Sequence, residues 1–360
     1  MRLFQNSSVY PGYLPRLRML AGGHLSFNAQ LQRFLADRYA ASHILKPVLE
    51  GSPHAFFTNG NDDQLQKAWA RENGLSSKAS PHDILLAQIE HHRTEVFYNL
   101  DPIRFDDSFV ARLPGCVKRR IAWRAAPSPH HNFHRYDLLV SNFPGILERF
   151  SEQGFRTAEF FPAHDDEMNR FAANEDRPID LLFVGGYSRH HKRRGAILEQ
   201  VACMAERWNV RFCLDPSRLT RLAESPLGVF PPLRKHRRPT VIQRVAQSGV
   251  FGLELYKALG QAKIVLNAAV DMAGEERGNM RCFEAMGCSS LLLSDEGRYP
   301  RGMVPGQTLM TFSDGRDAVA QAEALLRGDP QVLRSIAKAG HQSIQNAYSR
   351  DSQWQAFLKL

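Results

Sequence analysis

Short apolar segments alternate with longer amphipathic segments along the whole chain. Short apolar runs indicate buried strands, and apolar positions that recur every third or fourth residue indicate helices that cover a sheet. The predicted strands are Arg2–Gln5, Ala55–Thr58, Val96–Leu100, Arg120–Trp123, Asp137–Ser141, Asp180–Gly185, Val210–Leu214, Lys263–Asn267, Ser290–Ser294 and Leu309–Phe312. The predicted helices include Phe27–Tyr39, Pro81–His92, Phe143–Gln153, Arg194–Arg207 and Gly252–Leu259. Strands separated by helices of this length form βαβ units, so the sequence predicts an α/β fold with parallel sheets.

A change of pattern near the middle of the chain indicates two domains. The polar run Asn174–Pro178 is followed by a fresh strand that runs into Gly185 and Gly186, as at the start of a Rossmann-type unit. We therefore expect Rossmann-like domains over about 1–170 and 171–345, followed by a terminal segment over 346–360. A ligand is then expected between the two halves, at the carboxyl ends of the strands. Residues 218–248 are rich in proline and basic residues, and we interpret them as a long surface insertion.

Composition places the chain among ordinary folded proteins. Of 360 residues, 43% are hydrophobic, and no apolar run approaches the ~20 residues that span a bilayer. The N-terminus turns polar at once, so no secretory signal is visible. The five cysteines form no CxxC pair, which argues against a disulfide framework or a zinc ribbon. We therefore expect a cytoplasmic protein.

Positive charge is the unusual global property. Lys and Arg number 46 against 37 Asp and Glu, which gives a net charge of +9. Basic residues cluster at 118–120, 189–194 and 234–238. Such clusters indicate an anionic partner, which can be a nucleic acid, a membrane surface or a phosphorylated small molecule.

The segment 275–288 carries the most specific chemistry. Gly278 permits an unusual backbone and Asn279 is a favoured N-cap, so a short helix is predicted over Met280–Met286. The free amides and positive dipole end of such a helix suit a diphosphate, and Arg281 adds a charged donor to the same place. One turn later, the Glu284 carboxylate is placed to accept hydrogen bonds from a ribose diol. The alternative is a capped helix on which Arg281 and Glu284 form a surface ion pair.

This segment resembles a known family. Seven residues separate Glu276 from Glu284, and residues 283–288 read FEAMGC. The pattern is similar to the E-x7-E and FEAxxCG motifs of the group 1 glycosyltransferases, most of all to their spore-maturation-protein-like branch. The strand ending in FVG at 183–185, the KIVLN strand at 263–267 and the IAKAG helix at 336–340 follow in the order of that branch.

The resemblance implies a GT-B fold, with two Rossmann-like domains facing each other across a cleft and a C-terminal helix that crosses back to the N-terminal domain. The C-terminal domain would bind a nucleotide diphosphate sugar, and the N-terminal domain would bind the acceptor. By this resemblance, Glu284 would hold the ribose, and the helix start at Asn279, Met280 and Arg281 would face the diphosphate. Gly185 and Gly186 would allow close approach of the backbone, and further phosphate contacts would come from Ser188, Arg193 and Arg194. Glu276 would contact the donor sugar. Glu276 and Arg281 would be catalytic.

The chain departs from the family pattern at three positions. Gly186 and His191 stand where many group 1 enzymes have an arginine and a lysine that clamp phosphate, and Ser289 replaces the glycine after the cysteine of the FEAxxCG motif. These changes leave the phosphate contacts open.

In the N-terminal half, the histidine-rich stretch 128–134 follows a predicted strand. We name His131 as a third candidate catalytic residue, because a histidine at the carboxyl end of a strand can contact a sugar or act as a base. The alternative is a solvated loop. The histidines lack the fixed spacing of a metal site, and no DxD triplet is present, so no metal is predicted.

The residues and the resemblance together predict a cytoplasmic, metal-independent hexosyltransferase without a cofactor, which moves a sugar from a nucleotide-sugar donor to a glycan, lipid-linked or protein acceptor. The resemblance alone implies that the enzyme is retaining. A nucleotide-sugar epimerase and an inactive nucleotide-binding module remain alternatives. A nucleic-acid-binding protein is disfavoured, since no helix-turn-helix, zinc or aromatic RNP signature is visible. The basic cluster at 234–238 is also compatible with peripheral contact at the inner face of the membrane.

Overall fold

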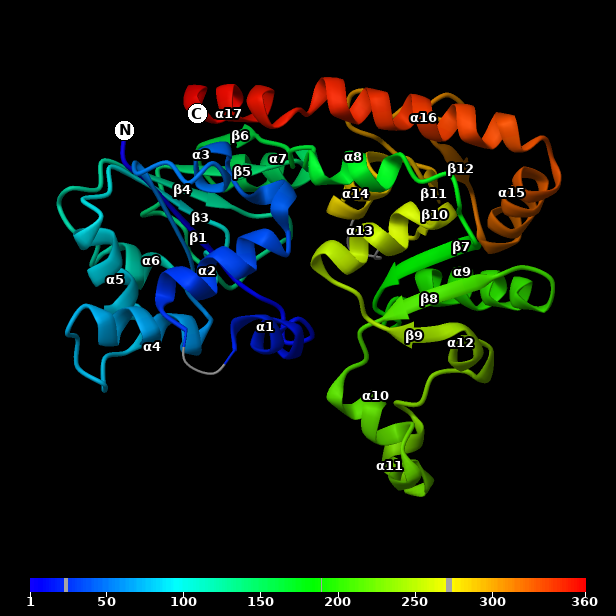
Figure 1. Ribbon diagram of the computed structural model, residues 1–360, viewed down its shortest axis with the longest axis horizontal. Coiled ribbons are helices and arrows are strands. Elements are labelled where there is room, and N and C mark those ends of the chain that lie inside the picture. Colours follow the sequence, from blue (N-terminus) through cyan, green and yellow to red (C-terminus); the bar gives the residue numbers. More distant parts are fainter. Residues whose placement is uncertain (23–24, 189, 270–273) are drawn as a thin grey trace. The chain divides into compact units, whose positions relative to one another are not determined.

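The computed structural model describes residues 1–22, 25–188, 190–269 and 274–360, and it divides into two compact units (Figure 1). Unit 1 comprises Met1–Ala163 and Arg350–Leu360, and unit 2 comprises His164–Ser349. Each unit is built on a six-stranded sheet of parallel strands, which confirms the α/β class. Among the described helices, none has both the length and the apolar character needed to cross a membrane.

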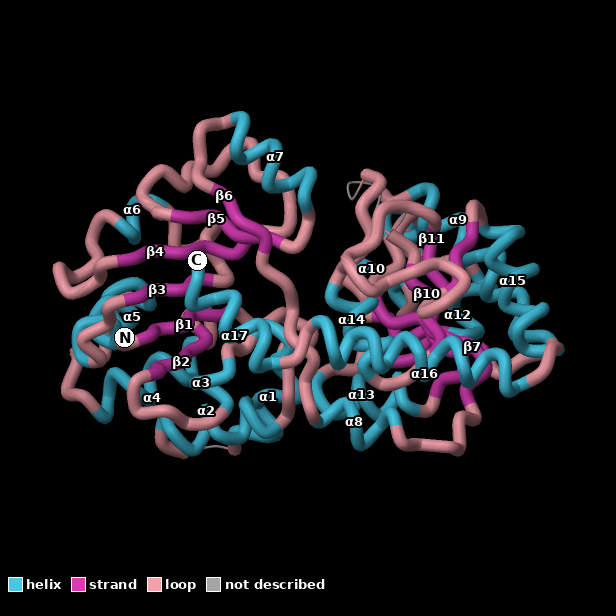
Figure 2. Tube along the Cα trace, turned by 90° about the horizontal axis from the view of Figure 1, so that it is seen from above, coloured by secondary structure: helices cyan, strands magenta, loops and turns pink. Residues whose placement is uncertain are grey.

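The sheet of unit 1 has the strand order β2-β1-β3-β4-β5-β6, and Figure 2 shows these strands side by side. The strands are β1 Leu3–Ser7, β2 Ala55–Asn59, β3 Val96–Asn99, β4 Arg119–Trp123, β5 Leu138–Ser141 and β6 Thr157–Glu159. The first five were predicted to within about two residues. The sixth was missed because it is short and none of its residues is buried, so it has no apolar run.

Helices cover both faces of this sheet. They are α1 Leu14–Ala21, α2 Phe27–Ala36, α3 Lys46–Leu49, α4 Asp63–Glu72, α5 Pro81–His91, α6 Asp107–Val110, α7 Pro144–Glu152 and, from the end of the chain, α17 Arg350–Lys359, with a 3-10 turn at Ala41–His43. Successive strand residues point to opposite faces. Phe97 therefore packs with α5, α6 and α7 in one cluster, whereas its neighbour Tyr98 packs with Phe357 of α17 in another.

Helix α17 is held in unit 1 by apolar and polar contacts. The ring of Phe357 lies 5.1 Å from that of Tyr98 and 5.7 Å from that of Trp354. At the start of the helix, the Arg350 guanidinium donates to the main-chain oxygens of Ala41 and Ile44, at 3.1 and 2.6 Å. Trp354 and Phe357 are therefore packing residues.

The sheet of unit 2 has the strand order β12-β11-β10-β7-β8-β9. Its strands are β7 Ile179–Gly185, β8 Val210–Leu214, β9 Ala246–Ser248, β10 Ala262–Asn267, β11 Leu291–Asp295 and β12 Met310–Phe312. Its helices are α8 Glu167–Ala172, α9 Lys192–Ala202, α10 Arg218–Ala223, α11 Pro231–Arg234, α12 Thr240–Val245, α13 Gly252–Gly260, α14 Met280–Gly287, α15 Gly315–Arg327 and α16 Pro330–Ala347, with 3-10 turns at Cys203–Glu206 and Pro226–Val229.

The predicted surface insertion over 218–248 is wrong for its last part. Helix α12 buries Ile242 and Val245 in the core of unit 2, and β9 extends the sheet by pairing with β8. These elements are too short to show a clear period in the sequence, which is why they were assigned to an insertion. Only the part that contains α10 and α11 lies outside the sheet and its covering helices (Figure 1).

Each sheet contains one point at which the chain leaves two neighbouring strands in opposite directions. In unit 2, β7 leads through α9 to β8, while its neighbour β10 leads through α14 to β11. In unit 1, β1 leads to β2 and its neighbour β3 leads to β4 on the other side. Ligands of open α/β sheets bind outside the carboxyl ends of such strands. These switch points place one candidate site in each unit.

Candidate functional site

The first turn of α14 lies at the switch point of unit 2. Asn279 is the N-cap residue, and Gly278 before it has a φ of 149°, so the predicted start of the helix is confirmed. The Asn279 side chain, however, does not cap the helix. Its Nδ2 donates to Oδ1 of Asn267 at 3.0 Å, and Asn267 in turn donates to Oγ of Ser294 at 2.9 Å. These amides tie the helix start to the carboxyl ends of β10 and β11.

The main-chain amides of Met280 and Arg281 belong to the first helical turn, in which N–H groups have no intrahelical acceptor. The positive end of the helix dipole lies at the same helix start. The two amides and the helix dipole, next to the end of β10, favour the binding of an anion.

Arg281 and Glu284 form a close ion pair. Nη1 of Arg281 donates to Oε2 of Glu284 at 2.6 Å. The alternative of a surface pair is wrong in one respect, because the Glu284 side chain is only 3% exposed. Burial raises the pKa of Glu284, and the nearby Arg281 guanidinium opposes the shift without cancelling it. A buried carboxylate of this kind is suited to accept hydrogen bonds from neutral hydroxyl groups.

Gly185 and Gly186 end β7 and differ in their surroundings. A Cβ on Gly185 would lie 2.6 Å from Nη2 of Arg194, whose guanidinium lies over the Phe183 ring at 5.1 Å from its centre. Arg194 therefore packs behind Gly185. A Cβ on Gly186 would meet no described atom within 4 Å, so the backbone there is open to close approach.

The other predicted phosphate ligands make local contacts. Oγ of Ser188 accepts from the amide of His190 at 3.2 Å. The exposed Arg193, in the first turn of α9, donates from Nη2 to the main-chain oxygen of Ser313 at 3.3 Å. Arg189, part of the same basic cluster, lies outside the described residues. Both described side chains remain candidates for phosphate binding.

Glu276 lies in a short bridge with Arg298 ahead of α14. Its Oε1 is 3.7 Å from Nη2 of Arg298, and its side chain is largely buried. Between Glu276 and the helix lies Arg277, which sequence analysis did not single out. Its side chain is 3% exposed, and Nη1 donates to the main-chain oxygens of Gly274 and Glu276 at 2.8 and 3.0 Å.

Nε of Arg277 also lies 3.7 Å from Oδ1 of Asp295, a carboxylate that accepts from the amide of Ala269 at 3.0 Å. Arg277 thus holds the segment before α14 against the end of β11. The sequence shows one arginine among several charged residues at this point, and nothing in that pattern distinguishes a buried arginine from an exposed one.

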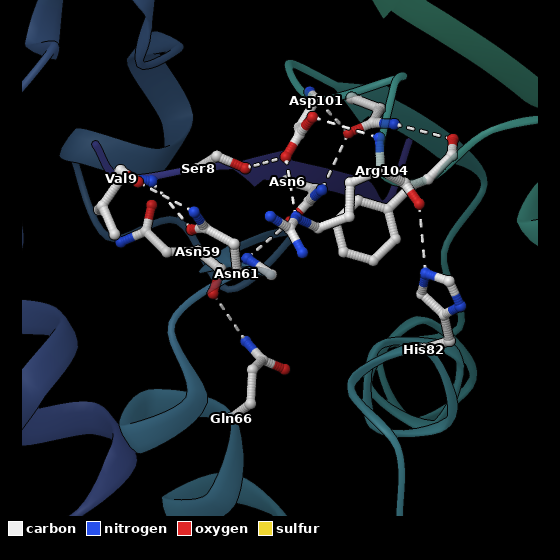
Figure 3. Close-up of polar contacts among 12 residues, drawn as sticks. Asn6, Ser8, Val9, Asn59, Asn61, Gln66, His82, Asp101 and Arg104 are labelled. Carbon is white, nitrogen blue, oxygen red and sulfur yellow. Dashed lines mark hydrogen bonds and ion pairs between the residues drawn. The ribbon is translucent and has the colours of Figure 1, made fainter. Parts of the chain in front are cut away.

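A second polar cluster lies at the switch point of unit 1 (Figure 3). Nδ2 of Asn6 donates to Oδ1 of Asn99 at 2.9 Å, and the amide of Gly60 donates to Oδ1 of Asn6 at 3.0 Å. Because a Cβ on Gly60 would lie 2.6 Å from that same oxygen, glycine is required for this approach. Buried amides of Asn6, Asn99 and Gly60 therefore fix the carboxyl ends of β1, β3 and β2 to one another.

Asp101 is the carboxylate of this cluster. Oγ of Ser8 donates to its Oδ2, and its amide donates to Oδ1 of Asn99 at 3.0 Å. Nε of Arg104 lies 3.4 Å from Oδ2, and the Asp101 side chain is 20% exposed (Figure 3). Burial lowers the pKa of Arg124, at the end of β4, and the charge of Asp101 opposes that shift. Sequence analysis missed these residues because each follows its strand singly, without a motif.

The histidine-rich stretch lies on the same edge of the sheet. Nε of Arg124 donates to Oγ of the buried Ser128 at 2.6 Å, and the amide of His131 donates to the main-chain oxygen of Ser128 at 3.1 Å. The side chain of His131 is exposed. Its catalytic role stays a prediction. Of the two tyrosines near the first strand, Tyr13 is buried, whereas Tyr10 is 68% exposed.

Comparison with known proteins shows a family match and several similar structures. Residues 207–359 match the family described as glycosyl transferase-like. HepE of Anabaena, solved with UDP and glucose, is 13% identical, with 99% of this chain and 98% of that chain covered and a TM-score of 0.57. Sucrose-phosphate synthase from Thermosynechococcus elongatus is 14% identical, with 100% and 98% covered and a TM-score of 0.53. A glycosyltransferase from Rickettsia africae is 11% identical, with 99% and 96% covered and a TM-score of 0.54. Curated protein sequences contain no significant match.

The protein has the GT-B fold. Its resemblance to the group 1 glycosyltransferases is confirmed, with the family match confined to residues 207–359. The match includes α14 with Arg281 and Glu284, so the segment that carried the resemblance lies inside the family region.

We expect the Arg277→Met variant to lose about 3–5 kcal/mol of unfolding free energy, because it leaves Asp295 and two main-chain oxygens without their buried cation. The Arg298→Met variant is the matched control. Its side chain is 67% exposed, so its loss should stay below about 1 kcal/mol. Urea unfolding at neutral pH measures both. Equal losses in the two variants would show that Arg277 does not hold the segment before α14.

Proposed function

We propose that the protein is a hexosyltransferase, which moves a sugar from a nucleotide diphosphate sugar to an acceptor hydroxyl group. The observation that carries the proposal is the buried Arg281–Glu284 pair beside the first-turn amides of α14, at the switch point of unit 2. The family match over this region and the UDP and glucose bound by HepE support the same reading.

In this proposal the diphosphate lies against the amides of Met280 and Arg281 and beside the open backbone of Gly186. Glu284 accepts hydrogen bonds from the ribose diol. Arg193 and Ser188 lie on the chain between β7 and α9, where they can extend the phosphate contacts. Glu276, whose backbone precedes the helix, faces the donor sugar.

The chemistry follows from the charge that develops during transfer. The sugar passes through an oxocarbenium-like state while its diphosphate leaving group gains negative charge. The Arg281 guanidinium and the positive helix end are fixed donors aimed at that charge, which is an efficient form of catalysis. Because these groups supply the positive charge, we propose that no metal is required and that turnover persists in EDTA. Retention of the anomeric configuration is proposed on the group 1 resemblance alone.

For the acceptor we propose the polar cluster of unit 1. Asp101 presents a partly exposed carboxylate whose position is set by Ser8 and by the amide network of β1 and β3. A carboxylate held in this way can accept a hydrogen bond from an acceptor hydroxyl group and orient its oxygen for attack. Arg124 and the exposed Tyr10 flank it, which suits a polar acceptor. His131 remains a candidate for the same role.

A thermal-shift panel of UDP, GDP, dTDP and CDP tests the donor site. A nucleotide at 100 times its dissociation constant should stabilise the protein by about 2.7 kcal/mol. We expect Glu284→Gln to weaken binding about tenfold, because a charge-assisted hydrogen bond becomes a neutral one. Gly186→Ala should weaken binding without lowering stability, since its Cβ meets no described atom.

The matched control for these variants is Glu296→Gln, which changes an exposed glutamate just after β11 and should leave nucleotide binding unchanged. If no nucleotide shifts the melting temperature, the donor site is refuted. If a nucleotide binds but no sugar is transferred or released, the protein is a nucleotide-binding module and the transferase proposal fails.

We expect the affinity for a UDP-sugar to fall as the pH is lowered, starting above 4.5, the ordinary pKa of glutamate. The raised pKa of Glu284 means that the carboxylate which the ribose needs is protonated early. The free energy of unfolding of the unliganded protein should instead rise as the pH is lowered over the same range. The reason is that Glu284 binds a proton more readily in the folded state than in the unfolded state. Calorimetric titration across pH tests this, and a Glu284→Gln profile that titrates like the wild type would contradict it.

Asp101→Asn tests the acceptor site. We expect transfer to the acceptor to fall by about 10²-fold, the usual effect of losing a positioned hydrogen-bond acceptor or base, while the nucleotide-induced thermal shift stays the same. Asp107→Asn, in the nearby helix α6, is the control. Equal transfer rates in the two variants, measured with a fixed donor and acceptor, would remove Asp101 from the acceptor site.

A further inference from the structure

Residues 217–239 form an ordered projection from unit 2, which we call the 217–239 hairpin. Figure 1 shows its helices α10 and α11 beyond β9 and α12, away from the sheet of unit 2. Its base is closed by Arg238, which donates from Nε and Nη2 to the two carboxylate oxygens of Glu224 at 2.7 and 2.5 Å. Burial would raise the pKa of Glu224, but the bonds from Arg238 outweigh it, and that pKa is lowered. The hairpin is therefore a defined structure.

The hairpin folds back on itself closely. A Cβ on Gly228 would lie 1.9 Å from the main-chain oxygen of Ala223, so the turn at Pro226–Val229 packs directly on α10. Ser217 caps α10 by accepting from the amide of Thr220 at 3.1 Å. This packing fixes what the hairpin presents at its end.

The end of the hairpin is apolar and exposed. Val229 is 67% exposed and Phe230 is 57% exposed, and both are followed by the exposed prolines 231 and 232. Leu219 on α10 is 46% exposed. Large apolar side chains that gather in one short segment of a water-facing surface indicate a binding surface for an apolar medium or partner. We call Val229, Phe230 and the two prolines the apolar tip.

Cations surround the apolar tip. Residues 217–239 contain six Lys and Arg residues against one acidic residue, Glu224, which is already bound to Arg238, so 6 − 1 = 5 cations remain in excess. Arg234, Lys235 and Arg237 follow the tip directly and are exposed, and Arg218 and Arg221 lie on α10. The partner of this surface must therefore be both anionic and apolar.

We propose that the 217–239 hairpin docks unit 2 on the surface of an anionic lipid bilayer. A bilayer interface satisfies both properties, since acidic headgroups meet the cations while Phe230 and Val229 enter the boundary of the acyl chains. A soluble polyanion would use the cations and leave the apolar tip in water. The docking is peripheral, it does not depend on the nucleotide site, and it would bring the enzyme to membrane-borne acceptors.

Vesicle sedimentation with the full chain tests the docking. We expect binding to phosphatidylcholine vesicles that contain about one-third phosphatidylglycerol, no binding to pure phosphatidylcholine, and weaker binding as salt is raised. Val229→Ser with Phe230→Ser should lower the partition coefficient about tenfold, and Arg234→Glu with Arg237→Glu should lower it at least as much. The matched controls are Val332→Ser and Arg334→Glu on α16, at an exposed apolar and an exposed basic position, which should bind like the wild type.

Phe230→Trp reports insertion directly, because its fluorescence should shift to the blue only with anionic vesicles. The docking is refuted if anionic vesicles do not bind the wild type, or if both pairs of variants bind normally. It is also refuted if dextran sulfate competes fully while the tip variants bind like the wild type, since that outcome identifies a soluble polyanion. Each variant should keep the wild-type melting temperature and nucleotide-induced shift, so failure here leaves the proposed transferase function standing.

Discussion

The parallel pairing of β10 with β7 on one side and β11 on the other determines where a ligand site of unit 2 lies. It sets Leu266 opposite Phe183 and Asn267 opposite Ser294, so the polar ends of three strands meet at one edge. The chain leaves β7 and β10 in opposite directions, and ligands of open α/β sheets bind outside the strand ends at such a point. The side-chain amide of Asn279 then fixes the start of α14 to this edge. The topology determines the edge at which a ligand can bind, and this hydrogen bond determines where the helix end lies on it.

Charged side chains are buried near the start of α14, and their burial is unfavourable for folding. Glu284, Arg277 and Asp295 are each almost fully buried, and burying an ion is unfavourable unless partners replace its water. Arg281 partners Glu284, while Arg277 is surrounded by main-chain oxygens and by Asp295. Apolar residues of similar volume often support a fold at least as well as a buried ion pair does. The retention of charged groups at the end of a sheet is therefore better explained by a polar ligand than by folding.

The sequence predicted the buried strands and helix α14 because both leave local signals. The strands show an apolar run, and the helix shows a glycine, an N-cap residue and a spaced pair of glutamates. The sequence could not predict β9 or α12, because both are short: β9 is placed by its pairing with β8, and α12 by the burial of Ile242 and Val245 in the core of unit 2. It also could not predict the environment of Arg277 or Asp101, since that is set by residues distant in the chain. The backbone conformation of Ser289 could not be predicted either. Its φ is 56°, in the left-handed region that glycine adopts without strain, which explains the glycine at this position of the family motif. The serine adopts this conformation at a cost in backbone strain.

The two candidate sites are built on different chemistry, and this difference explains why only one of them was visible in the sequence. Unit 2 gathers ion pairs, whose spacing on one helix is fixed by the helical period and can be read along the chain. Unit 1 joins its strand ends with the neutral side-chain amides of Asn6 and Asn99, which both donate and accept and therefore need no fixed spacing. Asp101 adds a carboxylate to this neutral framework, with Arg104 beside it. A site whose framework is neutral and whose carboxylate Asp101 is carried by a loop can change its ligand by single substitutions, without disturbing the sheet that supports it.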